Sequence, residues 1–253
     1  MPRSTLSKLL IIAFLFLPTT TFSETFSANS PPHRTALLEL YTSQGCSSCP
    51  PTESWLADLQ NNEFSPEHVI PVALHVDYWD YIGWKDKFAS AEHTLRQHRH
   101  VKQNDLNTLY TPQLILNGND LRPRNKLRKN LASITAQTAP ANIQLQAVVS
   151  DENLLDITCT VSLEDNAAKK LKLNLVIAEN NLITAIRAGE NRGKKLRHEH
   201  VVRQILESTL VTTEPRHETL PLNPSWHHEN LEIVAFIENN AGDVLQALVL
   251  PLR

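Results

Sequence analysis

The sequence predicts an α/β segment followed by a segment of antiparallel β-strands. Residues 35–138 alternate strand-like and helix-like runs, from the apolar TALLELYT through a short helix to the second strand HVIPVALHVD. Such a strand–helix–strand unit requires parallel strands joined by a right-handed crossover. Residues 141–253 instead contain β-rich runs, such as NIQLQAVVS and LEIVAFIEN, which are typical of a sandwich-like, mostly antiparallel domain. We place the boundary between the two predicted domains near Thr138 to Ala141.

The first residues have the features of an export signal. Arg3 and Lys8 provide a basic start, residues 9–17 form an uninterrupted apolar run, and Pro18 ends it. The run is shorter than the roughly 20 apolar residues that span a bilayer, and it fits a secretory signal over residues 1–23. We therefore expect a secreted or periplasmic protein without a membrane anchor after cleavage, in a compartment where thiols tend to be oxidised.

The composition limits the possible partners. The chain has 253 residues, of which 41% are hydrophobic and 20% charged, so it can bury a core of ordinary size. Its formal net charge of −3 does not favour binding to nucleic acid. The single methionine is the first residue, which excludes a copper site built from thioethers.

The first segment contains three predicted helices and a hairpin. PPTESWLADLQNN predicts a short helix, and a long polar helix is expected over about residues 85–104. On that polar helix we expect His93, His98 and His100 to face solvent. TPQLILNGND combines a strand-like core with an Asn-Gly turn, a strong hairpin signal. NKLRKNLASITAQ then predicts an amphipathic helix with Leu127 and Leu131 on one side.

The stretch TSQGCSSCPPTE places Cys46 and Cys49 between the first strand and the first helix. In sheets of this kind, chemistry collects at the carboxyl ends of the strands. A helix N-terminus favours a thiolate, which is the reactive form of cysteine. Cys46 is the expected attacking residue, and the spacing allows Cys49 to resolve a mixed disulfide.

Three features resemble the thioredoxin superfamily: CSSC after a first strand, the strand–helix–strand order, and YTPQLILNG. The resemblance covers roughly residues 35–137 and implies a thioredoxin-like fold. It implies that Pro112 is a cis-proline packed against the CxxC disulfide and that Thr111 binds the substrate backbone. Gly45 stands where thioredoxins usually have Trp, and Ser47-Ser48 replaces Gly-Pro, so the redox direction stays open.

Longer motifs are similar to those of a family of bacterial secreted proteins with a thioredoxin-like region. These motifs are ELYTSQGCSSCPPTE, HVDYWDYIGWKDKFAS and GENRGKKLRHEHVVR. The family is catalogued as a domain of unknown function. The resemblance covers nearly the whole mature chain and therefore bears on the fold more than on an activity.

Two further groups are candidate site residues. Glu39 lies in the first strand, where burial on both faces would raise the pKa of its carboxyl group. By resemblance to a buried aspartate of thioredoxins, Glu39 is a candidate to move protons for Cys49; the alternative is that it faces solvent or pairs with a lysine. Tyr78, Trp79 and Trp84 follow the second strand and are candidates for substrate binding, the alternative being that they only cover the core.

The sequence therefore predicts an exported thiol–disulfide oxidoreductase that acts on protein or small-molecule thiols and disulfides, with no cofactor and no metal site assigned. One alternative is a copper-binding protein that uses Cys46, Cys49 and His75, because soft thiolates accept copper(I). The other is a binding module whose disulfide is only structural. Cys159 alternates with apolar residues, so we expect it to be buried and inert.

Overall fold

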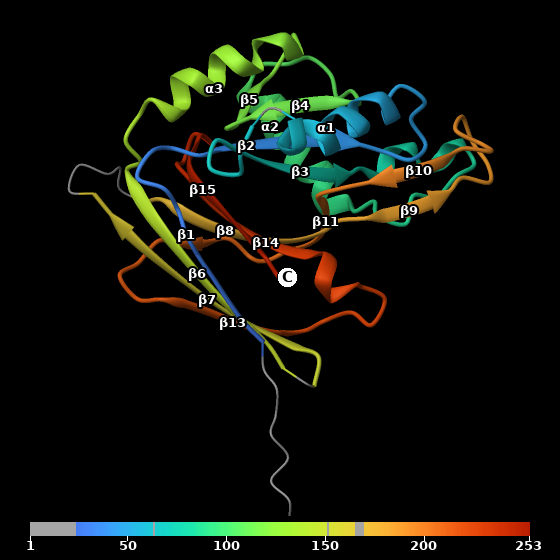
Figure 1. The fold of residues 1–253 in the computed structure, drawn as a ribbon. Coiled ribbons are helices and arrows are strands. Elements are labelled where there is room, and N and C mark those ends of the chain that lie inside the picture. The colour runs from blue at the N-terminus through green and yellow to red at the C-terminus, as the bar shows by residue number, and fades with distance from the viewer. Residues whose placement is uncertain (1–23, 63, 151, 165–169) are drawn as a thin grey trace, which may run out of the picture.

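Figure 1 shows the fold in a computed structural model, which describes residues 24–62, 64–150, 152–164 and 170–253. The predicted signal at residues 1–23 lies outside the described residues. The strands form a mixed nine-stranded sheet, an antiparallel four-stranded sheet and a two-stranded hairpin. Among the residues described, no helix is both long enough and apolar enough to cross a lipid bilayer.

The nine-stranded sheet contains strands from both predicted domains. Its spatial order is β15 (Val244–Pro251), β14 (Leu231–Glu238), β8 (Lys172–Glu179), β11 (Val201–Ile205), β3 (Val69–His75), β2 (Ala36–Thr42), β4 (Gln113–Leu116) and β5 (Asn119–Asp120), with β12 (Thr209–Leu210) paired to β8. The four-stranded sheet is β1 (Glu24–Asn29), β6 (Ala141–Val149), β7 (Leu154–Leu163) and β13 (Arg216–Pro221). The hairpin pairs β9 (Leu182–Ala185) with β10 (Lys195–His198).

The described residues also form three α-helices and three short 3-10 helices. They are α1 (Pro50–Asn62), α2 (Ala91–Gln103) and α3 (Leu127–Thr135), with 3-10 turns at Asp77–Ile82, Arg124–Lys126 and His228–Asn230.

The predicted strand–helix–strand unit is present as β2, α1 and β3. The two strands run parallel, and α1 crosses between them on the outer face of the sheet. Leu56 and Leu59 of α1 pack with Leu38 and Leu40 of β2, because alternate residues of a strand face the same side. Leu131 of α3 joins the same cluster, which confirms the predicted amphipathic helix.

The nine-stranded sheet is curled, so that its first and sixth strands approach each other. Arg34, just before β2, donates hydrogen bonds to the carbonyl oxygens of Val244 (2.7 Å) and Leu245 (3.0 Å) in β15. An apolar cluster lines the inner face of the curl and includes Leu37, Tyr41, Val72, Leu74, Val176, Val234 and Phe236. The curl thus gives the sheet an enclosed inner face and an outer face that other elements cover.

The four-stranded sheet covers the outer face of β8, β14 and β15, as Figure 1 shows below the helices. Ile143 and Leu145 of β6 pack with Leu175 and Ile177 of β8. Cys159 of β7 lies in the same cluster, and burial raises the pKa of its thiol to about 12. This supports the prediction of a buried, inert cysteine.

The predicted domain boundary falls in the segment between α3 and β6. Strands from both sides of it nevertheless share one sheet, since β11 pairs with β3 and β8. The two-domain division stays a prediction about segments of the sequence, while the sheet itself is continuous.

The hairpin prediction is confirmed, and the prediction for the polar helix is partly wrong. Asn117 and Gly118 both have positive φ between β4 and β5, as the turn requires. Helix α2 begins after Ser90, which caps it through a bond from Glu92 N (3.2 Å). His93 and His100 are buried, contrary to the prediction that they face solvent, because this side of α2 packs against the curled sheet. His98 is exposed, as expected.

Candidate functional site

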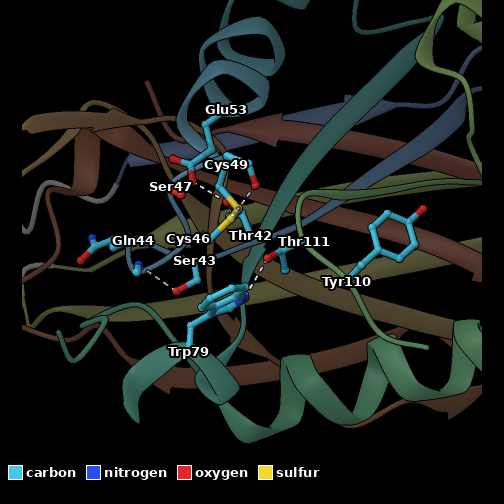
Figure 2. The surroundings of a disulfide bond; sticks show 12 residues. Thr42, Ser43, Gln44, Cys46, Ser47, Cys49, Glu53, Trp79, Tyr110 and Thr111 are labelled. Atoms are coloured by element: carbon cyan, nitrogen blue, oxygen red, sulfur yellow. Dashed lines mark hydrogen bonds between the residues drawn. A yellow bond between two sulfur atoms is a disulfide. The ribbon is translucent and has the colours of Figure 1, made fainter. Parts of the chain in front are cut away.

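Cys46 and Cys49 form a disulfide between the end of β2 and the start of α1 (Figure 2). Their Cα atoms lie 5.5 Å apart, and only three positions separate them in the sequence. The carbonyl oxygen of Cys49 accepts hydrogen bonds from Thr52 N (2.9 Å) and Glu53 N (3.1 Å), which start the helix. The pair therefore occupies the helix N-terminus that the sequence predicts.

The Thr111–Pro112 peptide bond is cis, as the resemblance implied. In the β2–β4 pairing, Tyr41 faces Gln113, so Pro112 lies one step beyond the last pair, at the end of β2 from which the cysteine loop departs. The Thr111 hydroxyl accepts a hydrogen bond from Trp79 Nε1 at 2.8 Å, and Figure 2 shows both residues beside the disulfide. The structure thus brings Thr111, Pro112 and Trp79 to the cysteine loop.

The other two aromatic candidates differ in position. Tyr78 donates a hydrogen bond to Gln97 on α2 (3.2 Å), and burial raises the pKa of its hydroxyl to about 12. Trp84 donates a hydrogen bond to the side-chain oxygen of Gln44 at 2.9 Å, so it contacts the cysteine loop. Both are half-buried, which gives them packing roles in addition to any contact with a ligand.

The cysteines are covered. Cys46 is 1% exposed and Cys49 0%, although Ser47 and Ser48 between them are exposed. A loop at residues 186–194, between β9 and β10, contacts the backbone around the pair; we call it the capping loop. Its Asn191 donates to the carbonyl oxygens of Gln44 and Cys46, both at 2.9 Å. The Glu190 carboxylate accepts a bond from Ser47 N at 3.1 Å. The capping loop therefore holds the backbone of the cysteine loop, whose two cysteines are buried in this state.

Glu39 is buried, but the prediction that burial raises the pKa of its carboxyl group is wrong. Burial opposes ionisation of this carboxyl group, yet Arg96 and His100 outweigh that effect and lower its pKa. Arg96 Nε lies 2.5 Å from Glu39 Oε1. Glu39 also faces the inner side of β2, with Leu37 and Tyr41, whereas α1 packs on the outer side. We assign it no proton transfer with Cys49, because it lies on the other face and is held in an ion pair.

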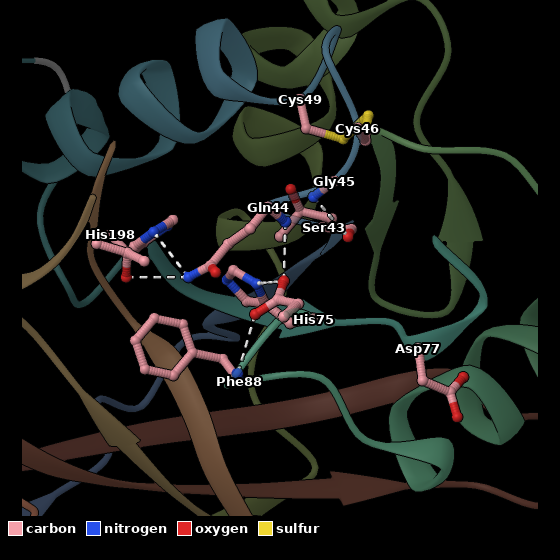
Figure 3. Close-up of polar contacts among 12 residues, drawn as sticks. Ser43, Gln44, Gly45, Cys46, Cys49, His75, Asp77, Phe88 and His198 are labelled. Carbon is pink, nitrogen blue, oxygen red and sulfur yellow. Dashed lines mark hydrogen bonds and ion pairs between the residues drawn. A yellow bond between two sulfur atoms is a disulfide. The ribbon is translucent and has the colours of Figure 1, made fainter. Parts of the chain in front are cut away.

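A second buried group, which we call the Glu53 cluster, lies on the outer face below the cysteine loop. It consists of Asp86, Glu53 of α1, His75 of β3 and His198 of β10. His198 Nδ1 lies 2.6 Å from Glu53 Oε2, and His75 Nδ1 lies 2.7 Å from Asp86 Oδ2. The rings of His75 and His198 meet edge to face with centroids 5.2 Å apart. Figure 3 shows the His198 imidazole to one side of the Gln44 side chain and the His75 imidazole below it, both lower in the view than the disulfide.

The cysteine loop and the Glu53 cluster are directly connected. Thr42, the last residue of β2, donates to Glu53 Oε1 at 2.5 Å. Gln44 N donates to Asp86 Oδ2 at 2.8 Å, and Gln44 Nε2 lies 3.3 Å from His198 Nε2. The polar groups under the disulfide therefore form one network.

Within the Glu53 cluster, the pKa values of the two carboxyl groups are lowered from their ordinary values, and the pKa of His75 is raised. Burial opposes the charged form of Glu53, but contacts with His198, His75 and Thr42 outweigh it and lower the pKa. Burial likewise opposes protonation of His75, but the Asp86 carboxylate outweighs it and raises the pKa. The Asp86 pKa is lowered by the same pairing, against its burial. The cluster thus favours ionised carboxylates beside a histidine that holds a proton more readily than usual.

The sequence indicates His75 only as a candidate copper ligand and gives no site role to His198. The spacing of Glu53, four residues after Cys49, was the available signal, since such positions share a helix face. The pairing of β11 with β3, which brings β10 close, cannot be read from either segment alone.

The fold and the site together define a protein with a curled mixed sheet, a flanking antiparallel sheet and a CxxC disulfide at a helix start. The chain belongs to a family described as proteins of unknown function (DUF1223), which matches residues 37–238. This confirms the predicted membership of a family without an assigned function.

Two solved structures share the fold. Protein AGR_C_4864 from Agrobacterium tumefaciens is 24% identical, with a TM-score of 0.61 over 88% of this chain and 97% of its own. HBP35 of Porphyromonas gingivalis is 16% identical, with a TM-score of 0.67 over 87% of this chain and 76% of its own. No curated protein sequence matches the chain. At these identities the likeness concerns the fold alone.

Proposed function

We propose that the protein is an exported thiol–disulfide oxidoreductase with a thioredoxin-like first half. The observation that carries the proposal is the cis Thr111–Pro112 peptide next to a CxxC disulfide at the start of α1. The order β2, α1, β3, α2, β4, β5, α3 supports the thioredoxin-like assignment, with β2 parallel to β3 and antiparallel to β4. A disulfide that is formed in the resting state suits a secreted or periplasmic location.

The exchange needs no cofactor. The Cys46 thiolate attacks one sulfur of a substrate disulfide, which forms a mixed disulfide and releases one substrate thiolate. The Cys49 thiolate then attacks Cys46 Sγ, which restores the Cys46–Cys49 bond and releases the second substrate thiolate. Two electrons pass from the protein dithiol to the substrate, and the reverse sequence oxidises a substrate dithiol.

Substrate would meet the site between Thr111 and the exposed serines. Ser47 and Ser48 are exposed, and the half-buried Thr111 has its hydroxyl oriented by Trp79. A peptide could pair with the backbone at Thr111, because an extended segment next to a strand offers unpaired backbone groups. Tyr78 and Trp84 are proposed to frame this surface from the same 77–84 segment.

Access to Cys46 requires the capping loop to move. In the resting state its Asn191 holds the backbone on either side of Gly45. The loop belongs to the β9–β10 hairpin, which pairs only with itself and can therefore shift without breaking the nine-stranded sheet. We include this movement in the proposed mechanism.

The two alternative functions, copper binding and a binding module with a structural disulfide, require different states of the cysteine pair. A copper site from Cys46, Cys49 and His75 requires both thiolates free, and here the two sulfurs are bonded to each other. A structural disulfide that closes so short a loop contributes about 2 kcal/mol at most by chain entropy. The reduction potential separates these cases from a redox-active pair.

The test equilibrates the mature protein with glutathione buffers and traps thiols with a maleimide. We expect a potential above about −300 mV, and we expect Cys49→Ser to accumulate a mixed disulfide with a model substrate while Cys46→Ser forms none. Cys159→Ala is the matched control and should behave like the wild type. A potential well below about −300 mV, with no mixed disulfide in Cys49→Ser, would rule out exchange and leave a structural bond.

A further inference from the structure

Three donor groups of the Glu53 cluster converge in the protein interior. One nitrogen of His75, one nitrogen of His198 and one carboxylate oxygen of Glu53 all lie within 4.8 Å of one another. The residues are 0%, 1% and 7% exposed. They come from β3, β10 and α1, so the fold assembles them from three separate segments.

His75 contributes a nitrogen with no partner. Its Nδ1 lies 2.7 Å from Asp86 Oδ2, and within the described part of the chain its buried Nε2 has no hydrogen-bond partner. A carboxylate accepts hydrogen bonds, so Asp86 keeps the proton of a neutral ring on Nδ1 and leaves the Nε2 lone pair free. A carboxylate behind a histidine is the arrangement that orients metal-binding imidazoles.

Glu53 and His198 are joined by a hydrogen bond in this structure. His198 Nδ1 donates to Glu53 Oε2 at 2.6 Å, and no lysine or arginine among the described residues forms an ion pair with Glu53 or Asp86. Their charge is instead met by the two histidines and by neutral donors, with Thr42 bonded to Glu53 and Gln44 N to Asp86. A bound cation would add a positive charge between the carboxylate of Glu53 and the two imidazoles.

We propose that Glu53, His75 and His198 bind a divalent cation of the zinc type beneath the disulfide. Two imidazoles and one carboxylate are a donor set that Zn²⁺ accepts, with a further position left for water or another ligand. All-oxygen cations such as Mg²⁺ and Ca²⁺ do not fit two nitrogens, and copper(I) prefers thiolates, which the disulfide removes.

Binding exchanges a proton for the ion. Starting from a protonated His198 ring, the cation takes the place of the proton between His198 Nδ1 and Glu53, that proton leaves the site, and the second ring proton stays on Nε2. If His198 binds through Nδ1, its Nε2 carries the remaining proton, and the Gln44 amide must present its oxygen there. Gln44 Nε2 lies 3.3 Å from that nitrogen, so binding of the ion would change a contact made by the cysteine loop.

The test measures Zn²⁺ binding by calorimetry to the full mature chain, stripped of metal and kept oxidised so that the sulfurs cannot bind. We expect one Zn²⁺ per chain, proton release on binding, and a rise in melting temperature. His75→Gln and His198→Gln should each weaken binding by at least about tenfold, and Co²⁺ should give visible absorption bands in the wild type only.

His200→Gln is the matched control. His200 is also a buried histidine beside a carboxylate, Glu232 at 2.8 Å, but it lies outside the cluster, so this variant should bind like the wild type. Absence of stoichiometric binding to the wild type, or equal binding by wild type and the His75→Gln/His198→Gln double variant, would overturn the proposal. Loss of binding in His227→Gln/His228→Gln instead would assign the metal to an adventitious surface pair.

Discussion

Two buried groups of charged side chains lie on opposite faces of the β2–β3 region, and they are neutralised in different ways. On the inner face, Glu39 and Glu238 share Arg96, at 2.5 and 2.6 Å. On the outer face, the carboxylates of Glu53 and Asp86 pair with histidines, and no lysine or arginine of the described residues forms an ion pair with them. We call the inner group, which also includes His100, the Glu39 cluster.

The difference lies in the permanence of the positive charge. A guanidinium keeps its charge at every physiological pH, so Arg96 remains a cation between Glu39 and Glu238 whatever the pH. An imidazole is positive only while it holds an extra proton, so the charge of the Glu53 cluster follows pH or a bound ion. The inner cluster therefore has the features of a structural ion pair, and the outer one those of a site.

The two clusters also differ in the elements that build them. The Glu39 cluster joins β2, α2 and β14, two of which are strands of the nine-stranded sheet. The Glu53 cluster includes His198 of β10, which belongs to the separate β9–β10 hairpin. The same hairpin carries the capping loop, so one hairpin contacts both the cysteine loop and the polar network beneath it.

The largest effect on stability is expected from a substitution that breaks the inner cluster. Arg96→Met leaves two carboxylates without their cation, and removing one partner of a buried pair costs about 4 kcal/mol in the free energy of unfolding. Denaturant titration measures this loss. Arg99→Met, on the exposed face of the same helix, should cost less than about 0.5 kcal/mol. Similar losses in the two variants would show that Arg96 does not stabilise the inner cluster.

A smaller effect sharpens the contrast between histidines with and without a carboxylate. His93 donates from Nδ1 to the carbonyl oxygen of His75 (2.9 Å), and burial lowers its pKa to about 4. The folded state therefore resists its protonation, so stability is complete above the unfolded pKa of about 6.5 and falls as the pH drops towards 4. Between about pH 7 and about pH 4.5 the loss is on the order of 2 kcal/mol.

Denaturant titrations across this pH range test the assignment. His93→Gln can keep the bond to the His75 carbonyl oxygen and should remove this contribution, so that its stability falls less on acidification than that of the wild type. His98→Gln, exposed on the same helix, should follow the wild type. Parallel curves for wild type and His93→Gln would contradict the lowered pKa. The raised pKa of His75 gives the opposite sign, with stability lost as the pH rises above about 6.5.

The sequence was sufficient for the features that depend on local patterns. The Asn117-Gly118 turn, the β2–α1–β3 unit and the cis bond before Pro112 follow from turn chemistry, periodicity and one family resemblance. Cys159 was placed in the core by simple alternation. Each of these needs information from only one short segment of the chain.

The features that the sequence missed depend on segments far apart in the chain. His93 and His100 sit among polar neighbours on α2, and only the curl of the sheet buries them. His198 approaches Glu53 across 145 positions, and Asn191 approaches Cys46 across 145 positions. A polar residue that is buried by a distant partner looks like a surface residue in its own segment.

The smallest expected effect concerns the hairpin that joins the disulfide to the outer cluster. Asn191→Ala removes both hydrogen bonds from the capping loop to the cysteine loop, which should loosen the cap by about 1–2 kcal/mol and speed reduction of the disulfide roughly five- to thirtyfold. Maleimide labelling after a brief exposure to a small phosphine measures the rate. Arg192→Ala changes the exposed neighbour and should leave the rate unaltered. Equal rates in wild type and Asn191→Ala would mean that reductant reaches the sulfurs past Ser47 and Ser48, and that the hairpin does not control access to them.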